Sequence, residues 1–345
     1  MKIKSLIFLG VLQCCVFVNA QIKTLDAVEY VNPLMGTQSL HSLSNGNTYP
    51  AICRPWGMNF WTPQTGKMGD GWAYIYTAEK IRGFKQTHQP SPWMNDYGQF
   101  SIMPVTGELK FKEEERQSWF SHKAETVTPY YYSVYLADHN VTTEITPTER
   151  AARFRFTFPE TDKAYIVIDA FDKGSYVKII PSERKIIGYT TKNSGGVPLN
   201  FKNYFVIIFD KELKLNSTFN GDILGNALEM QADHAGAVIG FKTKAGEQVN
   251  AQVASSFISY EQAERNLKEI GKDNFDELKE KGKETWNKEL SRIKVEGGTN
   301  DQMGTFIPVC TDRFFFRESF LSSTRIKNRF ITVLITEKFC RVICS

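Results

Sequence analysis

The stretch ARFRFTFPETDKAYIVIDAF, residues 152–171, decides the fold. Its first half alternates apolar and polar side chains, and its second half contains an apolar run. These are the patterns of half-buried and fully buried β-strands. Aromatic and β-branched residues, which favour strands, are frequent in both halves. We therefore predict two strands, at 152–158 and 164–171.

Segments of the same character lie on both sides of this stretch and are separated by turn-forming residues. No helix is predicted in the connections between them, so the sheets should be mainly antiparallel. Residues 21–110 are rich in Gly, Pro, Asn and aromatic residues, which predicts long loops between short strands. The further predicted strands are 130–136, 204–210, 235–242 and 248–258.

The pattern changes from strand to helix at Ser259. A capping box that starts there begins a predicted helix over 260–270. In 274–293, apolar residues recur near helical spacing between Lys and Glu, which predicts a second helix. We therefore predict a mainly β protein, with a large antiparallel β-sandwich over 21–258 and two linker α-helices within 259–306.

Residues 1–20 have the pattern of an export signal peptide. Two lysines precede an apolar run that is too short to span a membrane, and small residues at 18–20 form a cleavage site. Cys14 and Cys15 leave a lipoprotein as the alternative, which the glutamine before them disfavours. We expect simple secretion to the periplasm or the cell exterior.

Charge and cysteine content exclude other classes of protein. The net charge is +4, but Lys2 and Lys4 contribute +2 and residues 307–345 contribute +4, which leaves 21–306 at −2. Without a basic field, this body does not predict nucleic-acid binding. The body holds one cysteine, Cys53, so neither a disulfide scaffold nor a zinc site is expected.

A series of short motifs runs along the chain in a fixed order. Together they resemble glycoside hydrolase family 92, exported α-1,2-mannosidases of bacterial type, over residues 26–306. The ordered set is far more specific than any single motif. The motifs are YVNPLMGT (30–37), GNTYP (46–50), PWGM (55–58), WTPQT (61–65), IRGF (81–84), THQPSPWMNDYG (87–98), WNKEL (286–290) and VEGGT (295–299).

The resemblance implies both a fold and a chemistry. The fold is a β-sandwich of the galactose-mutarotase-like supersandwich kind, linker helices and an (α/α)6 barrel. The activity is that of calcium-dependent, inverting, exo-acting α-mannosidases that trim mannose from glycans. Inversion needs a carboxylic acid and a carboxylate, and in the family both come from the barrel, with most calcium ligands. The barrel would begin near residue 300, so we expect neither a catalytic residue nor bound calcium in this chain alone.

The C-terminal tail does not look like the end of a folded domain. Ile326 to Ser345 is basic, strand-prone and without turn signals. Moving the reading frame back by one base at Ile307 permits a continuous string that does resemble the family. We therefore expect a frameshift after Phe306, an out-of-frame tail over 307–345, and a missing barrel as the natural packing partner of the domain.

The loop 87–98 contains two candidate substrate-binding residues, Trp93 and Asp96. An aromatic face stacks on the apolar side of a sugar, and a carboxylate accepts hydrogen bonds from its hydroxyls. The alternative is that Trp93 packs the loop and Asp96 caps a turn. The resemblance places this loop at the domain interface near the sugar pocket, which favours substrate contact.

His88, Asp70 and Trp72 are further candidates for substrate binding. His88 either hydrogen-bonds a sugar or fixes the loop, and a lone histidine is more often structural. Asp70 and Trp72 lie in the sequence GDGW, where a turn followed by a core tryptophan is the alternative. No residue is predicted to be catalytic or to bind a metal.

Three functions stay open. The first is the N-terminal domain of an α-mannosidase, which binds a mannose-containing glycan and is not catalytic alone. The second is a stand-alone carbohydrate-binding module. The third is a non-functional truncated remnant, in which the missing barrel leaves the apolar stripe around Trp286 exposed. None of them involves nucleic acid or a transmembrane segment.

Overall fold

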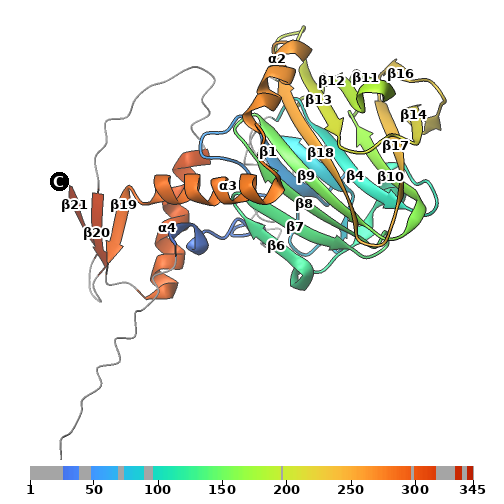
Figure 1. Ribbon diagram of the computed structural model, residues 1–345. Helices are drawn as coiled ribbons and strands as arrows, with labels where there is room; N and C mark the ends of the chain where they lie inside the picture. Colours follow the sequence, from blue (N-terminus) through green and yellow to red (C-terminus); the bar gives the residue numbers. More distant parts are fainter. Residues whose placement is uncertain are drawn as a thin grey trace, which may run out of the picture.

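The computed structural model describes residues 26–38, 48–68, 74–88, 96–195, 197–296, 299–315, 331–335 and 340–344. Two large antiparallel sheets lie face to face, and the C-terminal helices lie beside them (Figure 1). The predicted class, a mainly β protein built on a large antiparallel sandwich with helices after it, is confirmed. The signal peptide predicted at 1–20 lies outside the described residues.

The first sheet has seven strands, and every neighbouring pair in it is antiparallel. The end of β3, the second strand of this sheet, positions the candidate site, because β3 ends at Thr87, directly before His88. In spatial order the strands are β1 Phe60–Gln64, β3 Gly83–Thr87, β4 Phe100–Thr106, β10 Thr161–Asp169, β17 Ala235–Thr243, β14 Leu215–Asn220 and β15 Ile223–Leu224.

The second sheet has nine strands and is also antiparallel throughout. Hairpins such as β11–β12 and β7–β8 join many neighbours. In spatial order the strands are β16 Glu229–Ala232, β11 Ser175–Ile180, β12 Lys185–Thr190, β13 Asn203–Phe209, β18 Glu247–Ser256, β9 Ala151–Phe158, β8 Val141–Pro147, β7 Tyr131–Leu136 and β6 Glu125–Thr128.

The two sheets enclose one large hydrophobic core. Along β9, Phe154 and its two aromatic neighbours at alternate positions are buried, while the residues between them are partly exposed. Trp61 of the first sheet meets Phe154 of the second edge to face, with 4.9 Å between ring centroids. Phe100 and Phe205 stack at 4.4 Å. Aromatic rings from both sheets therefore interlock across the sandwich.

Two helices follow β18 where they were predicted. The side chain of Ser259 caps α2, Tyr260–Asn266, and Asn274 forms a capping box with Glu277 at the start of α3, Phe275–Leu290. A third helix, α4 Asn300–Phe315, was not predicted. None of the described helices is long and apolar enough to span a membrane. The short elements are η1 Ala27–Tyr30, α1 Glu113–Arg116, η3 His122–Ala124, η4 Pro181–Glu183, η5 Leu267–Glu269, β2 Lys80–Ile81, β5 Ser118–Trp119, β19 Ile293–Glu296, β20 Ile331–Ile335 and β21 Cys340–Cys344.

The apolar stripe of α3 packs against the rest of the domain. Trp286 is fully buried, and its Nε1 donates a hydrogen bond to the backbone oxygen of Cys53 at 2.9 Å. The guanidinium of Arg54 donates to the carbonyl oxygens of Leu278, at 2.9 Å, and Pro147, at 2.8 Å. The exposed stripe that the remnant alternative assumes is therefore not observed around Trp286, because the N-terminal segment and the sandwich cover it.

Candidate functional site

Strand β3 carries polar side chains into the interior. All residues of Gly83–Thr87 are buried, although Lys85, Gln86 and Thr87 are polar. Buried polar groups require partners, and the hydroxyl of Thr87 lies 2.6 Å from that of Tyr49. The end of β3 is therefore specified by hydrogen bonds as well as by apolar packing.

The carboxylate of Asp96 closes the loop that follows β3. Its Oδ1 accepts hydrogen bonds from the backbone N–H groups of His88, at 3.1 Å, and Tyr97, at 2.8 Å. Its Oδ2 accepts a hydrogen bond from the side-chain amide of Gln99. One carboxylate therefore ties the backbone at His88 to the backbone at Tyr97.

The imidazole of His88 lies buried under this closure. Its Nδ1–H donates to the carbonyl oxygen of Tyr97 at 2.6 Å, which leaves Nε2 of the neutral ring as an acceptor. Nε2 is buried and has no hydrogen-bond partner in the described part of the chain. The rings of Tyr97 and Phe257 flank it at centroid distances of 5.4 Å and 4.9 Å.

Buried amide groups surround the same loop. Asn203 Nδ2 donates to the backbone oxygen of Gly98 at 2.7 Å and to Oε1 of Gln86 at 3.1 Å. Gln86 Nε2, Gln99 Oε1 and Asn203 Oδ1 are buried without a hydrogen-bond partner among the described residues. Buried polar atoms without partners cost free energy, so polar groups that reach this place are favourable.

Burial shifts the pKa of both titratable groups of the loop. It raises the pKa of Asp96 to about 6, against the opposing effects of Lys85 and the hydrogen bonds. It lowers the pKa of His88 to about 4, against the hydrogen bond to Tyr97. At neutral pH the loop therefore holds a charged Asp96 and a neutral His88.

We predict that His88→Gln makes the domain less sensitive to acid. Between about pH 6.5 and about pH 4, the unfolded chain protonates His88 while the folded chain does not, so the domain loses stability as the pH falls through this window. Urea unfolding at pH 7 and at pH 5 measures the loss, which should be smaller for the variant than for the parent.

The reciprocal control is Asp96→Asn. The raised pKa of Asp96 means that the folded state binds the proton more tightly, so this group adds stability as the pH falls from about 6 to about 4. Removing it should make the domain more sensitive to acid. Identical losses in the parent and both variants would contradict the assignment of these two groups.

Two of the five predicted substrate-binding residues, His88 and Asp96, lie together in this arrangement. The other three, Trp93, Asp70 and Trp72, lie outside the described residues. The hydrogen bonds that Asp96 accepts from the backbone of His88 and Tyr97 are the ones expected if its carboxylate caps a turn. Asp96 belongs to the same loop as Trp93 in sequence.

The prediction did not include Gln99 and Asn203, which complete the site. Asn203 lies 105 positions from Gly98 in sequence, so no local pattern connects them. Gly98 gives the one signal that was available. It has φ +70°, and a Cβ there would lie 2.6 Å from Cβ of Asn203, so the glycine that ends the motif allows this close approach.

The described residues contain no cluster of acidic, histidine or cysteine side chains suited to a metal ion. No group of three or more His, Cys, Asp or Glu side chains among them is placed to hold a metal ion. Asp169 pairs instead with Arg116 and His234. The described residues therefore offer no cluster of carboxylates of the kind that commonly binds calcium.

Comparison with known proteins now places the chain. Residues 30–256 match the glycosyl hydrolase family 92 N-terminal domain. Residues 262–309 match the glycosyl hydrolase family 92 catalytic domain. The chain belongs to glycosyl hydrolase family 92.

Solved structures of this family share the fold. The family GH92 inverting mannosidase BT2199 from Bacteroides thetaiotaomicron VPI-5482 is 45% identical with a TM-score of 0.83, over 90% of this chain and 42% of that one. The α-mannosidase BT3965 of the same species, in complex with mannoimidazole, is 30% identical with a TM-score of 0.74, over 82% of this chain and 39% of that one. A curated relative, an uncharacterized secreted glycosidase of Arthroderma benhamiae, is 22% identical over 80% of this chain and 40% of its own length. The chain thus spans about two fifths of the length of these relatives.

Proposed function

We propose that this chain is the substrate-binding N-terminal part of an exported, calcium-dependent, inverting exo-α-mannosidase that acts on mannose-containing glycans. The observation that carries the proposal is the closed loop of His88 and Asp96, within a chain that is 45% identical to an inverting mannosidase. The fixed ends of the loop support a role in presenting Trp93 to a sugar. Asp70 and Trp72 complete the proposed set of substrate contacts.

In this proposal His88 offers its buried Nε2 as an acceptor for a sugar hydroxyl. The neutral ring suits this role, because a protonated imidazole could only donate. Asp96 holds the loop through three donors and, as a carboxylate, retains lone pairs for a hydroxyl. The buried amides of Gln86 and Gln99 provide further polar atoms beside the loop.

The proposal assigns binding, and not bond cleavage, to these residues. Inversion requires an acid and a base roughly 6.5–9.5 Å apart across the sugar. Asp96 is already an acceptor for protein donors, and no second carboxylate faces it among the hydrogen bonds and ion pairs of the described loop. We assign the acid, the base and the calcium ligands to the catalytic domain, of which only residues 262–309 match here.

We predict that the purified chain does not hydrolyse mannosides, with or without added calcium. The test is release of mannose from an α-mannobioside at high protein concentration, with a chelator-treated sample in parallel. Mannose release that the chelator abolishes would contradict the assignment of bond cleavage to the catalytic domain. The inverting mannosidase that is 45% identical to this chain provides the positive control in the same assay.

The tail is a separate proposal. We infer that residues 307–345 are read out of frame, and the match to the catalytic domain supports this because it ends at residue 309, three positions after Phe306. The nucleotide sequence downstream of codon 306 tests it. A reading frame that continues into catalytic-domain sequence is expected, and a downstream region interrupted by stop codons in that frame would contradict it.

Export is proposed from the sequence of residues 1–20. The curated relative is described as secreted, which supports the proposal. Secretion of the full chain from a bacterial host, with loss of the first 20 residues by mass, is the expected result. Retention in the cytoplasm at full mass would contradict it.

A further inference from the structure

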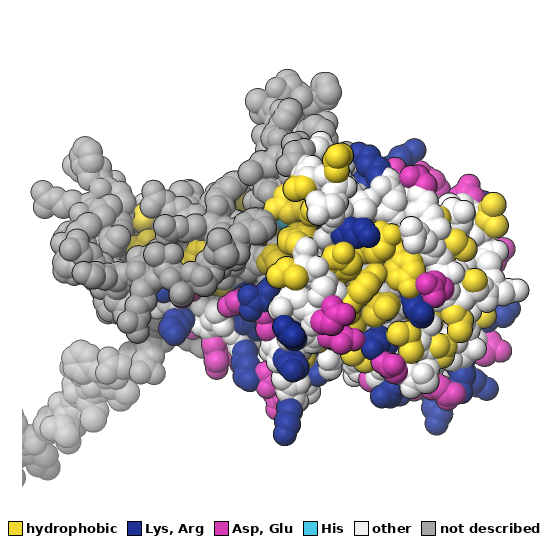
Figure 2. Space-filling view, turned by 90° about the horizontal axis from the view of Figure 1, so that it is seen from above, with side chains coloured by type: hydrophobic (Ala, Val, Ile, Leu, Met, Phe, Trp, Pro, Cys, Tyr) yellow, Lys and Arg dark blue, Asp and Glu magenta, His cyan; other side chains and the backbone are white. Residues whose placement is uncertain are grey.

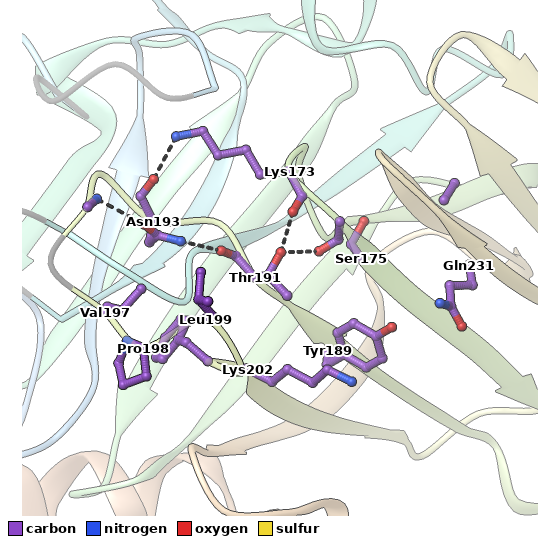
Figure 3. A pocket seen from close by; sticks show the side chains of 14 residues that line it. Lys173, Ser175, Tyr189, Thr191, Asn193, Val197, Pro198, Leu199, Lys202 and Gln231 are labelled. Atoms are coloured by element: carbon purple, nitrogen blue, oxygen red, sulfur yellow. Dashed lines mark hydrogen bonds between the residues drawn. The ribbon is translucent and has the colours of Figure 1, made fainter.

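A second pocket, of about 480 Å³, lies between the outer face of the nine-stranded sheet and the loop 191–202. Strands β11, β12 and β16 form its floor and the loop forms its wall (Figure 3). Its volume lies in the range of small-molecule sites. The residues that carry the argument are Lys173, Tyr189, Asn193, Leu199, Lys202 and Gln231.

The turn beside the pocket has a strained backbone conformation. Phe171 and Lys173 have φ of +62° and +72°, in the left-handed region that side chains disfavour. Thr191 holds this turn by donating its hydroxyl to the carbonyl of Gly174 at 2.8 Å, and Lys173 Nζ donates to the backbone oxygen of Asn193 at 2.8 Å (Figure 3). Such strain persists where surrounding contacts maintain it, and it is concentrated at binding sites.

Aromatic rings extend from the pocket across the outer face of the second sheet. Tyr189 stacks on Tyr176 of the neighbouring strand at 5.5 Å, and it meets Tyr204 on its other side at 6.1 Å. Tyr260 of α2 continues the row at 4.9 Å from Tyr204. Hydrophobic side chains gather on the side of the molecule where α2 lies (Figure 2). At the rim of the pocket, Leu199 is fully exposed.

Several polar groups in the pocket are available to a ligand. Neither the hydroxyl of Tyr189 nor the side-chain amide of Gln231 makes a hydrogen bond to a described residue, and Gln231 is exposed. The ammonium of Lys202 lies 4.1 Å from the centre of the Tyr189 ring. None of the described residues that line the pocket carries a carboxylate. The lining therefore combines ring surface with donors and acceptors that are mostly uncharged.

This chemistry favours a sugar over an anion or a lipid. Both lysines already have partners. Lys173 donates to a backbone carbonyl oxygen, and Lys202 lies over an aromatic ring. The pocket therefore does not offer two unpaired positive charges to one anion. The amides and hydroxyls are too numerous for an apolar chain. Sugars combine apolar C–H faces for rings such as that of Tyr189 with hydroxyls for amides such as that of Gln231.

The pocket and the candidate loop share a backbone connection. Ser194 N–H donates to the carbonyl oxygen of Asp96 at 2.9 Å, and Gly98 N–H donates to that of Lys192 at 2.7 Å. The ring of Phe201, which lines the pocket, meets that of Tyr97 edge to face at 5.7 Å. The pocket and the loop closed by Asp96 are therefore neighbours, in contact through the rings of Phe201 and Tyr97.

From these observations the structure assigns a second sugar-binding site to this pocket, which accepts a mannose residue of an oligosaccharide beside the site at loop 88–99. The choice of mannose rests on the proposed function. The site lies entirely on strands and loops of the sandwich, so it is complete in this chain.

Titration of the full chain with α-mannotriose, followed by calorimetry or by NMR, tests the assignment. Tyr189→Ala and Gln231→Ala should each weaken binding about ten-fold, since each removes one contact to the sugar. The matched controls are Tyr135→Ala and Gln248→Ala, exposed residues on β7 and β18 outside the pocket, which should bind like the parent. Equal thermal midpoints for all variants establish that they fold.

The outcomes separate the two proposals. Absence of saturable binding by the parent at millimolar mannotriose, or binding that Tyr189→Ala and Gln231→Ala leave unchanged, overturns the second site and leaves the hydrolysis test of the proposed function intact. Binding of a galacto-oligosaccharide in place of mannotriose, lost on Tyr189→Ala, would retain a sugar site but overturn its assignment to mannose. Loss of affinity in Trp93→Ala alone would locate all binding at loop 88–99.

Discussion

Arg116→Met is expected to lower the free energy of unfolding by about 3–5 kcal/mol, because it leaves a buried carboxylate without its partner. Arg116 is buried, and its Nη1 donates to Oδ2 of Asp169 at 2.7 Å. Its Nε and Nη1 also donate to the carbonyl oxygens of Arg82, at 2.9 Å, and Phe111, at 3.1 Å. Burial alone would raise the pKa of Asp169, but Arg116 and His234 hold it well below its usual range.

Urea unfolding at pH 7 measures this loss, and two variants control it. Lys214→Met removes an exposed ion pair with Glu212 and should change stability little. Arg116→Met combined with Asp169→Asn should recover part of the loss, because it no longer leaves an unpaired charge in the interior. A single Arg116→Met variant as stable as Lys214→Met would show that this ion pair does not hold α1 to the sheet.

The depressed pKa of Asp169 also sets the direction of its pH dependence. Its stabilising effect is present above the pKa of an unfolded aspartate, about 4, and is lost as the pH falls below that value. This window lies below that of His88, so the two groups contribute to acid unfolding in successive steps.

Residues 152–158 show why most of the sandwich could be predicted from sequence. This strand faces the core on one side and solvent on the other, so apolar and polar residues alternate along it. The observed strand is Ala151–Phe158. The end of 164–171 was predicted too far, because Asp169 pairs with Arg116 and Phe171 has φ +62°. A turn residue with a large side chain resembles a strand residue until its backbone is known.

The candidate site was less predictable for a related reason. Strand β3 is buried on both faces and uses polar residues such as Lys85 and Gln86 there, so neither alternation nor an apolar run marks it. The resemblance to the family pointed to His88 and Asp96, while composition alone would not. Partners such as Asn203 come from another sheet, and only the fold brings them to the loop.

Trp286→Ala is expected to lower the free energy of unfolding by about 3–5 kcal/mol, the cost of removing a fully buried large aromatic side chain. The substitution also leaves the carbonyl of Cys53 without the indole N–H that it accepts at 2.9 Å. The Trp286 side chain joins α3 to the segment before β1. Its removal should therefore unfold or detach the helical linker before the sandwich unfolds. Protease cleavage within 259–306 should then precede cleavage of the sandwich.

Trp119→Ala is the matched control, since Trp119 is 45% exposed and lies on a short edge strand. It should change stability far less than Trp286→Ala, because an exposed ring loses little on truncation. The comparison decides whether the linker is part of the folded domain or an apolar remnant. If both variants unfold at the same urea concentration and the linker is cleaved equally fast in the parent, α3 does not pack on the sandwich. If only Trp286→Ala is destabilised, the linker belongs to the domain, because its apolar stripe is then buried whether or not another domain follows.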